Sequence, residues 1–259
     1  MDLFMKYVIA NLKMNLVTAK ECDAYLEKLK QSFAVAAIPS DVKLIVCPSP
    51  FFMERFAKQL PDSVWLGGQD VFSEIKGSFT GEISIASYQD VSTKAVICGH
   101  SERRLYAQKT DDDIARTAEL VVKNDIVAIV CIGETQKERE DDQTTEVIGN
   151  QVQTVLDKIS EEYVDRLIFA YEPRWAIGGT TVPTVQEIMQ IRIVIQKILI
   201  KKYGVEKASC VRILYGGSVN ASLVDDVCLQ PDMDGVLVGR ESLDPHELIK
   251  IITAVGNKK

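Results

Sequence analysis

The stretch LIFAYEPRWAIG, residues 167–178, is the most informative part of this chain. Its first five residues form a short apolar run that indicates a buried strand, and a carboxylate, Glu172, follows directly. Pro173 fixes its own φ and pushes Glu172 toward an extended backbone. The loop around Trp175 is too apolar for an ordinary surface loop, which predicts a lid over the carboxylate that ends at Gly178. A solvated glutamate at a strand end is the simpler alternative.

Seven other apolar, β-branched runs accompany this one, with amphipathic helical windows between them. The strand candidates are residues 7–11, 44–48, 64–69, 95–99, 127–133, 167–171, 211–215 and 235–238. Because these runs lack polar alternation, we expect both faces of each strand to be covered, as in parallel sheets with helical crossovers. The pattern predicts an α/β fold, a closed eight-stranded parallel (β/α)8 barrel, rather than an open doubly wound sheet of about five or six strands.

Helix-capping signals lie between the strand candidates. Thr18 and Thr184 are each followed three residues later by glutamate, which predicts capping boxes, and Thr110 precedes three aspartates suited to a helix N-terminus. Gly204 is placed to end the helix that begins near Thr184. No linker, low-complexity tract or composition shift divides the chain, so we expect one barrel domain over residues 1–259.

The composition argues against several classes of protein. A net charge of −7 disfavours a surface for nucleic acid or an anionic membrane. No run approaches the ~20 apolar residues of a membrane span, and the N-terminus lacks the apolar stretch of a signal peptide, which predicts a cytoplasmic protein. The six cysteines show no CxxC spacing and only two histidines are present, so we expect free thiols rather than disulfides or a metal site.

Polar residues gather where the predicted strands end, which is the face that carries the sites of such barrels. They are Asn11 and Lys13 after the first strand, His100 and Glu102 after the fourth, and Glu172 after the sixth. Glycine-rich turns follow the last two strands, at residues 216–218 and 239–240. Backbone N–H groups at two such turns favour an anion, so we expect a phosphate cradle, although each glycine alone also suits a tight turn.

Six segments resemble the signature segments of the triosephosphate isomerases, in the same order and spacing along the whole chain. They are ANLKMN (10–15), CGHSERR (98–104), CIGE (131–134), AYEPRWAIG (170–178), YGGSV (215–219) and DGVLVGR (234–240). The resemblance implies a homodimeric barrel that needs no cofactor or metal. It implies an enzyme that interconverts dihydroxyacetone phosphate and D-glyceraldehyde 3-phosphate through an enediol.

The residue types suit that proton transfer. Glu172 is the expected base, because moving a proton between adjacent carbons needs a carboxylate that faces the substrate. His100 precedes a helical start whose N–H groups disfavour the imidazolium, which suits a neutral donor to the developing oxyanion. Lys13 is the expected cation beside the phosphate and the enediolate, with Asn11 as a polar orienter and Glu102 as the ion-pair partner of Lys13.

Plainer alternatives exist for these residues. A lone buried histidine is more often a core residue, and Lys13 fits a surface lysine equally well. The other histidine, His246, is expected at the surface near a helix start. By resemblance, the phosphate ligands are Gly178, Gly217, Ser218, Gly239 and Arg240, the last through its backbone N–H. Also by resemblance, the partners of Trp175 in the lid are Tyr171, Glu134 and Tyr215.

The chain departs from the family pattern at several positions. Leu12 stands where tryptophan is usual beside the lysine, Arg240 replaces the second glycine of the last turn, and Arg174 and residues 179–183 differ from the usual lid. Two further departures are Asp70 for an asparagine and Lys109 for an acidic residue. Because Leu12 would leave room and Arg240 would add a donor, an isomerase of a four-carbon ketose phosphate, erythrulose phosphate, is the second candidate.

Two other classes of protein fit part of the pattern, and one loop bears on assembly. A Schiff-base lyase on a barrel would use Lys13 as its nucleophile. A sugar-phosphate sensor would keep the glycine turns but would have no reason to keep Glu172 and His100. The loop 76–82 resembles one that members of the family insert beside the neighbouring subunit's site, and its Phe79 and Thr80 predict a homodimer.

Overall fold

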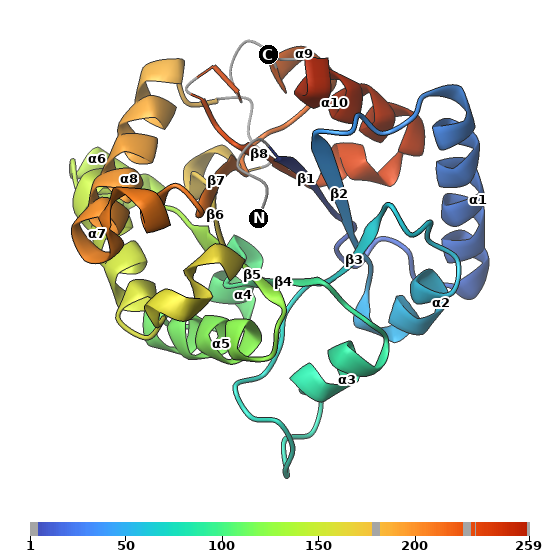
Figure 1. Ribbon diagram of the computed structural model, residues 1–259, viewed down its shortest axis with the longest axis horizontal. Helices are drawn as coiled ribbons and strands as arrows, with labels where there is room; N and C mark the ends of the chain where they lie inside the picture. Colours follow the sequence, from blue (N-terminus) through green and yellow to red (C-terminus); the bar gives the residue numbers. More distant parts are fainter. Residues whose placement is uncertain (1–4, 178–181, 225–228, 231, 258–259) are drawn as a thin grey trace.

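Eight parallel strands close into a barrel in this computed structural model, which describes residues 5–177, 182–224, 229–230 and 232–257. Each strand pairs with the next along the chain, and β8 returns to pair with β1, which confirms the predicted closed barrel (Figure 1). The strands are β1 (Lys6–Asn11), β2 (Val42–Cys47), β3 (Trp65–Gly68), β4 (Ala95–Cys98), β5 (Val127–Ile132), β6 (Leu167–Tyr171), β7 (Arg212–Tyr215) and β8 (Gly235–Val238). Every predicted strand is therefore present, with each end displaced by two residues at most.

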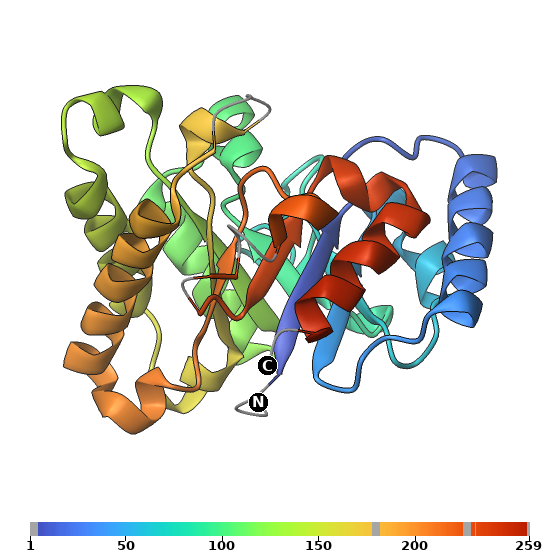
Figure 2. The same ribbon diagram turned by 90° about the horizontal axis from the view of Figure 1, so that it is seen from above.

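Helices surround the barrel and connect its strands (Figures 1 and 2). They are α1 (Ala19–Val35), α2 (Met53–Ala57), α3 (Ile85–Asp90), α4 (Ser101–Tyr106), α5 (Asp111–Lys123), α6 (Gln136–Glu140), α7 (Thr144–Leu156), α8 (Val185–Ala208), α9 (Ala221–Leu223) and α10 (Pro245–Asn257). Among the described residues, 3₁₀ turns accompany them at η1 (Pro50–Phe52), η2 (Glu161–Arg166), η3 (Arg174–Ala176) and η5 (Arg240–Leu243).

The predicted helix signals act as expected. Thr18, Thr110 and Thr184 each cap a helix through a reciprocal pair of hydrogen bonds with the acid three residues later. Gly204 has a φ of 78° and interrupts α8, because glycine adopts this left-handed conformation without a steric penalty. The local capping chemistry thus fixes where the connecting helices begin and, at Gly204, where one of them breaks.

The strands separate two apolar layers. Along β6, Ile168 and Ala170 belong to a small cluster built mostly from strand residues, which is the barrel interior. Leu167, Phe169 and Tyr171 alternate with them and pack in a larger cluster that includes the helices. Both faces of each strand are apolar, and this explains why the sequence shows continuous apolar runs without polar alternation.

The chain between β3 and α3 makes a long excursion away from the barrel, seen at the bottom of Figure 1. Phe79 lies in it, 41% exposed, with its ring centroid 4.6 Å from that of Phe72. Lys109 holds its ammonium 5.7 Å from the Phe72 ring centroid. The excursion is thus tied down by aromatic contacts while it still presents an apolar ring to its surroundings.

The cysteines of the described ranges are free thiols: Cys22, Cys47, Cys98 and Cys131 are buried and Cys210 is half-buried. Cys228 lies outside these ranges. No helix within them is long and apolar enough to cross a membrane. Nor do they hold a group of three or more His, Cys, Asp or Glu side chains arranged for a metal ion.

Candidate active site

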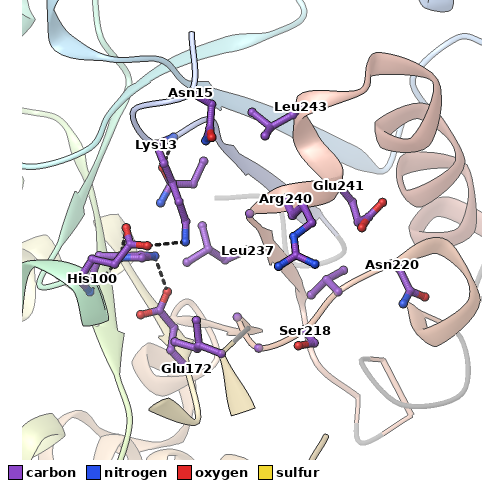
Figure 3. A pocket seen from close by; sticks show the side chains of 17 residues that line it. Lys13, Asn15, His100, Glu172, Ser218, Asn220, Leu237, Arg240, Glu241 and Leu243 are labelled. Atoms are coloured by element: carbon purple, nitrogen blue, oxygen red, sulfur yellow. Dashed lines mark hydrogen bonds and ion pairs between the residues drawn. The ribbon is translucent and has the colours of Figure 1, made fainter. Parts of the chain in front are cut away.

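A cavity of about 510 Å³ lies at the carboxyl ends of the strands (Figure 3). Nine of the predicted site residues line it: Asn11, Lys13, His100, Glu102, Glu172, Gly217, Ser218, Gly239 and Arg240. Gly178, the tenth, is outside the described residues. Side chains that are far apart in the sequence therefore meet in one cavity, because parallel barrel strands all deliver their carboxyl ends to the same face.

Glu172 leaves the end of β6 with its carboxylate buried at 2% exposure. One carboxylate oxygen accepts a hydrogen bond from the Ser101 backbone N–H at 3.0 Å, and the other lies 3.2 Å from Nε2 of His100. Its backbone N–H donates to the carbonyl of Ile132 at 2.7 Å. A Cβ at Gly133 would lie only 1.8 Å from the Glu172 carbonyl oxygen, so this close approach of β5 to β6 requires glycine.

His100 is the N-cap of α4, and its Nδ1 accepts a hydrogen bond from the Glu102 backbone N–H at 3.3 Å. A ring nitrogen that accepts from a backbone N–H carries no proton itself, so the proton of a neutral ring resides on Nε2. Nε2 is the atom that faces Glu172 (Figure 3). The short helix thus orients the imidazole so that an N–H points into the cavity.

Lys13 adopts a φ of 51°, a left-handed conformation that costs a non-glycine residue about 1 kcal/mol or more. Its backbone N–H donates to the Asn11 side chain at 3.1 Å, and its carbonyl accepts from the Gln69 side chain at 2.9 Å. The Lys13 ammonium pairs with Glu102 at 2.7 Å, as predicted. Gln69 was not expected in this role, because only its position at a strand end is visible in the sequence.

The first turn of the predicted lid, η3, is anchored to the barrel. The Trp175 indole N–H donates to Glu134 at 2.7 Å, and the Tyr171 hydroxyl donates to the same carboxylate oxygen at 3.1 Å. The Arg139 guanidinium stacks on the indole, 3.7 Å from its centroid. Burial, followed by the charge of Glu134, raises the pKa of Tyr171, so its hydroxyl remains a donor.

The far wall of the cavity is formed by the turns after β7 and β8. The Ser218 hydroxyl donates to the Ala176 carbonyl at 3.2 Å, which ties this wall to the lid segment. A Cβ built on Gly239 would lie 3.5 Å from Cε of Lys13, so the turn after β8 is next to the lysine. The exposed Arg240 side chain extends into the cavity from this wall (Figure 3).

One expectation about the cavity is wrong. Leu12 is 1% exposed and packs in the outer apolar layer between strands and helices, so it does not line the cavity. A smaller residue at position 12 therefore adds no room beside Lys13. With this correction, nothing in the described residues favours the four-carbon substrate.

The cavity and its surroundings also contain side chains for which the sequence predicted no role. Asn15, Asn220, Leu237 and Glu241 line the cavity, and the only signal that the sequence holds for them is that they lie within or directly after the signature segments. Asp70, one of the departures from the family pattern, pairs with Arg103 at 2.6 Å. Burial, followed by the charge of Glu172, raises the pKa of the Cys131 thiol well above its ordinary range, so a neutral thiol adjoins the carboxylate.

Comparison with known proteins agrees with this geometry. The family model for triosephosphate isomerase matches residues 6–255. The triosephosphate isomerase of Endomicrobium trichonymphae is 40% identical over 243 residues, which cover 93% of this chain and 95% of that protein. That of Psychromonas ingrahamii is 38% identical over 95% of this chain and 96% of that protein. That of Aspergillus oryzae is 36% identical over 96% of this chain and 97% of that protein. The chain belongs to the triosephosphate isomerase family.

Proposed function

We propose that this chain is an isomerase that interconverts dihydroxyacetone phosphate and D-glyceraldehyde 3-phosphate by proton transfer through an enediolate. The observation that carries the proposal is the contact between the buried Glu172 carboxylate and Nε2 of His100 inside a cavity whose opposite wall suits a phosphate. Membership of the triosephosphate isomerase family supports the same reaction.

Glu172 is the proposed base, which removes a proton from the carbon beside the substrate carbonyl and returns it to the neighbouring carbon. Its burial supports this role, because exclusion of water removes the hydration shell of the carboxylate and limits loss of the abstracted proton to the solvent. The Ser101 N–H and Nε2 of His100 fix the position of the carboxylate at the wall of the cavity.

His100 and Lys13 are the proposed stabilisers of the enediolate. The Nε2–H of His100 donates to the oxygen that develops charge, and the Lys13 ammonium supplies a positive charge nearby. The ion pair between Lys13 and Glu102, and the hydrogen bond that the Lys13 backbone N–H donates to the Asn11 side chain, support a fixed position for that ammonium. Gly217, Ser218, Gly239 and Arg240 are proposed to bind the phosphate through their N–H groups, together with Gly178 of the lid.

A steady-state assay tests this function. We expect the purified chain to interconvert the two triose phosphates without added metal or cofactor, with kcat/KM in the range of efficient enzymes, about 10⁴–10⁸ M⁻¹s⁻¹. Erythrulose phosphate in the same assay serves as the comparison substrate. If the four-carbon compound had the higher kcat/KM, the assignment of substrate would be wrong although the proton-transfer chemistry would stand.

We also propose that the chain works as a homodimer in the cytoplasm, through the loop 76–82. The exposed Phe79 and Thr80, in the excursion between β3 and α3, support this assembly, because an exposed apolar ring suits a partner surface. Replacing both by aspartate should cost dimerisation and activity together. Sedimentation velocity at micromolar concentration checks it, and a fully active wild-type monomer would refute the dimer.

A further inference from the structure

The charged side chains that line the cavity differ in how they are held. Lys13 already pairs with Glu102, and Glu172 with the Ser101 N–H and His100. Arg240 has no hydrogen bond or ion pair with any residue that the structure describes. Its guanidinium reaches into the cavity between Ser218 and Leu237, on the wall opposite His100 and Glu172 (Figure 3). The Arg240 guanidinium, unpaired among the described residues, thus lies at the end of the cavity that is remote from the reacting groups.

The charges that line the cavity indicate what this guanidinium contributes. The described acidic residues of its lining are Glu102, Glu172 and Glu241, and the described basic ones, histidine aside, are Lys13 and Arg240. A phosphate monoester carries a charge of about −1.5 to −2 at pH 7. Without Arg240 such a ligand would meet three carboxylates and a single lysine that is already paired. Electrostatic repulsion would then oppose binding.

We propose that the Arg240 guanidinium is a direct ligand of the substrate's phosphate, in addition to the backbone N–H groups of the two glycine turns; this rests on the proposed function. A guanidinium offers a planar fork of N–H donors that matches two phosphate oxygens at once, and it stays charged at all working pH values. Arg240 is a binding and specificity-determining residue. It selects phosphorylated substrates, and it does not take part in the proton transfer.

The test compares Arg240→Gln and Arg240→Lys with the wild type on three quantities. These are kcat and KM for glyceraldehyde 3-phosphate, the inhibition constant of inorganic phosphate, and kcat/KM for phosphate-free glyceraldehyde. For Arg240→Gln we expect KM and the inhibition constant to rise together, by about tenfold, as for the loss of charge-assisted hydrogen bonds at an exposed site. The kcat should stay within about twofold, and turnover of glyceraldehyde should not change, because that substrate has no phosphate.

Two further variants make the comparison specific. Arg240→Lys keeps the charge but loses the fork, so its constants should fall between those of the wild type and Arg240→Gln. Arg116→Gln removes one positive charge from the exposed face of α5, where Arg116 pairs with Asp112 and Asp113 and does not line the cavity. It should leave all three quantities at wild-type values.

Either of two results would overturn the inference. KM and the phosphate inhibition constant could stay unchanged in Arg240→Gln, in which case the guanidinium does not touch the phosphate. Alternatively, turnover of glyceraldehyde could fall as much as that of the phosphorylated triose, in which case Arg240 acts through packing or on the carbon skeleton. If the wild type does not isomerise triose phosphates at all, the proposed function fails. Calorimetric binding of inorganic phosphate to wild type and Arg240→Gln then still decides the role of Arg240.

Discussion

The two ends of the cavity are built differently. At the reaction end, Glu172 and His100 each have two polar partners in the folded chain, so their positions are set before the substrate arrives. At the phosphate end, the Arg240 side chain is exposed and, among the described residues, unpaired. Positions must be fixed where bonds break, because a displacement of about 1 Å there lowers the rate by a large factor. The Arg240 guanidinium at the other end can attract a phosphate from several positions, because its electrostatic attraction acts over a longer range. Changes at the first end should therefore act on kcat and changes at the second on KM.

The largest expected effect is that of Glu172→Gln, which keeps the size and an acceptor oxygen but removes the base. We expect kcat to fall by about 10³ with little change in KM, because the interaction lost is made only in the transition state. Glu172→Asp, which withdraws the carboxylate by about 1 Å, should lower kcat by a similar factor. Steady-state kinetics measures both, and wild-type turnover in either variant would remove Glu172 from the mechanism.

His100→Gln should have the next largest effect. Loss of one preorganised donor to a developing oxyanion lowers kcat by about 10² or more. The glutamine leaves a side chain of similar length at the N-cap of α4, so we expect the variant to fold. A rise in KM alone, with kcat unchanged, would show that His100 binds the substrate and does not stabilise the transition state.

Two glycine-to-alanine variants compare the closely packed reaction end with a helix outside the cavity. Gly133→Ala places a methyl group 1.8 Å from the Glu172 carbonyl oxygen, so we expect a loss of about 2 kcal/mol in stability and a lower kcat as β6 shifts. Gly149→Ala in α7 meets only Ile198, at 3.8 Å, and should gain about 0.5–1 kcal/mol. Urea unfolding and kcat of both variants check this, and equal stability changes would contradict the close fit at Gly133.

Much of this arrangement could be predicted from the sequence because local chemistry encodes it. The apolar runs predict the strands, since both strand faces bury apolar side chains, and threonine with an acid three residues later predicts the helix starts at Thr18 and Thr184. The position of Glu172 after β6 likewise follows from the strand before it.

The direction of side chains beyond the strand ends could not be predicted in the same way. Leu12 was expected beside the cavity, but it packs in the outer layer, and the left-handed Lys13 next to it depends on distant contacts with Gln69. Arg240 was expected to add a donor at the rim, and its side chain does enter the cavity, but its position on the wall opposite His100 and Glu172 is visible only in three dimensions. These features arise from residues far apart in the chain, and no local pattern reports them.

Isotope exchange with the solvent reports whether Glu172 carries a proton between two carbons while the opposite wall only binds the phosphate. Dihydroxyacetone phosphate is isomerised in D₂O, and NMR measures deuterium at carbon 2 of the glyceraldehyde 3-phosphate formed. We predict that carbon 2 carries the hydrogen that Glu172 moves from carbon 1 or, where the Glu172 proton exchanges with the solvent before it is returned, deuterium. Glu172→Gln should lower the rate of formation of both products by about 10³, while Arg240→Gln at saturating substrate should leave the rate and the isotope ratio nearly unchanged. Product formation by Glu172→Gln at the wild-type rate, whichever isotope is found at carbon 2, would contradict this role of Glu172.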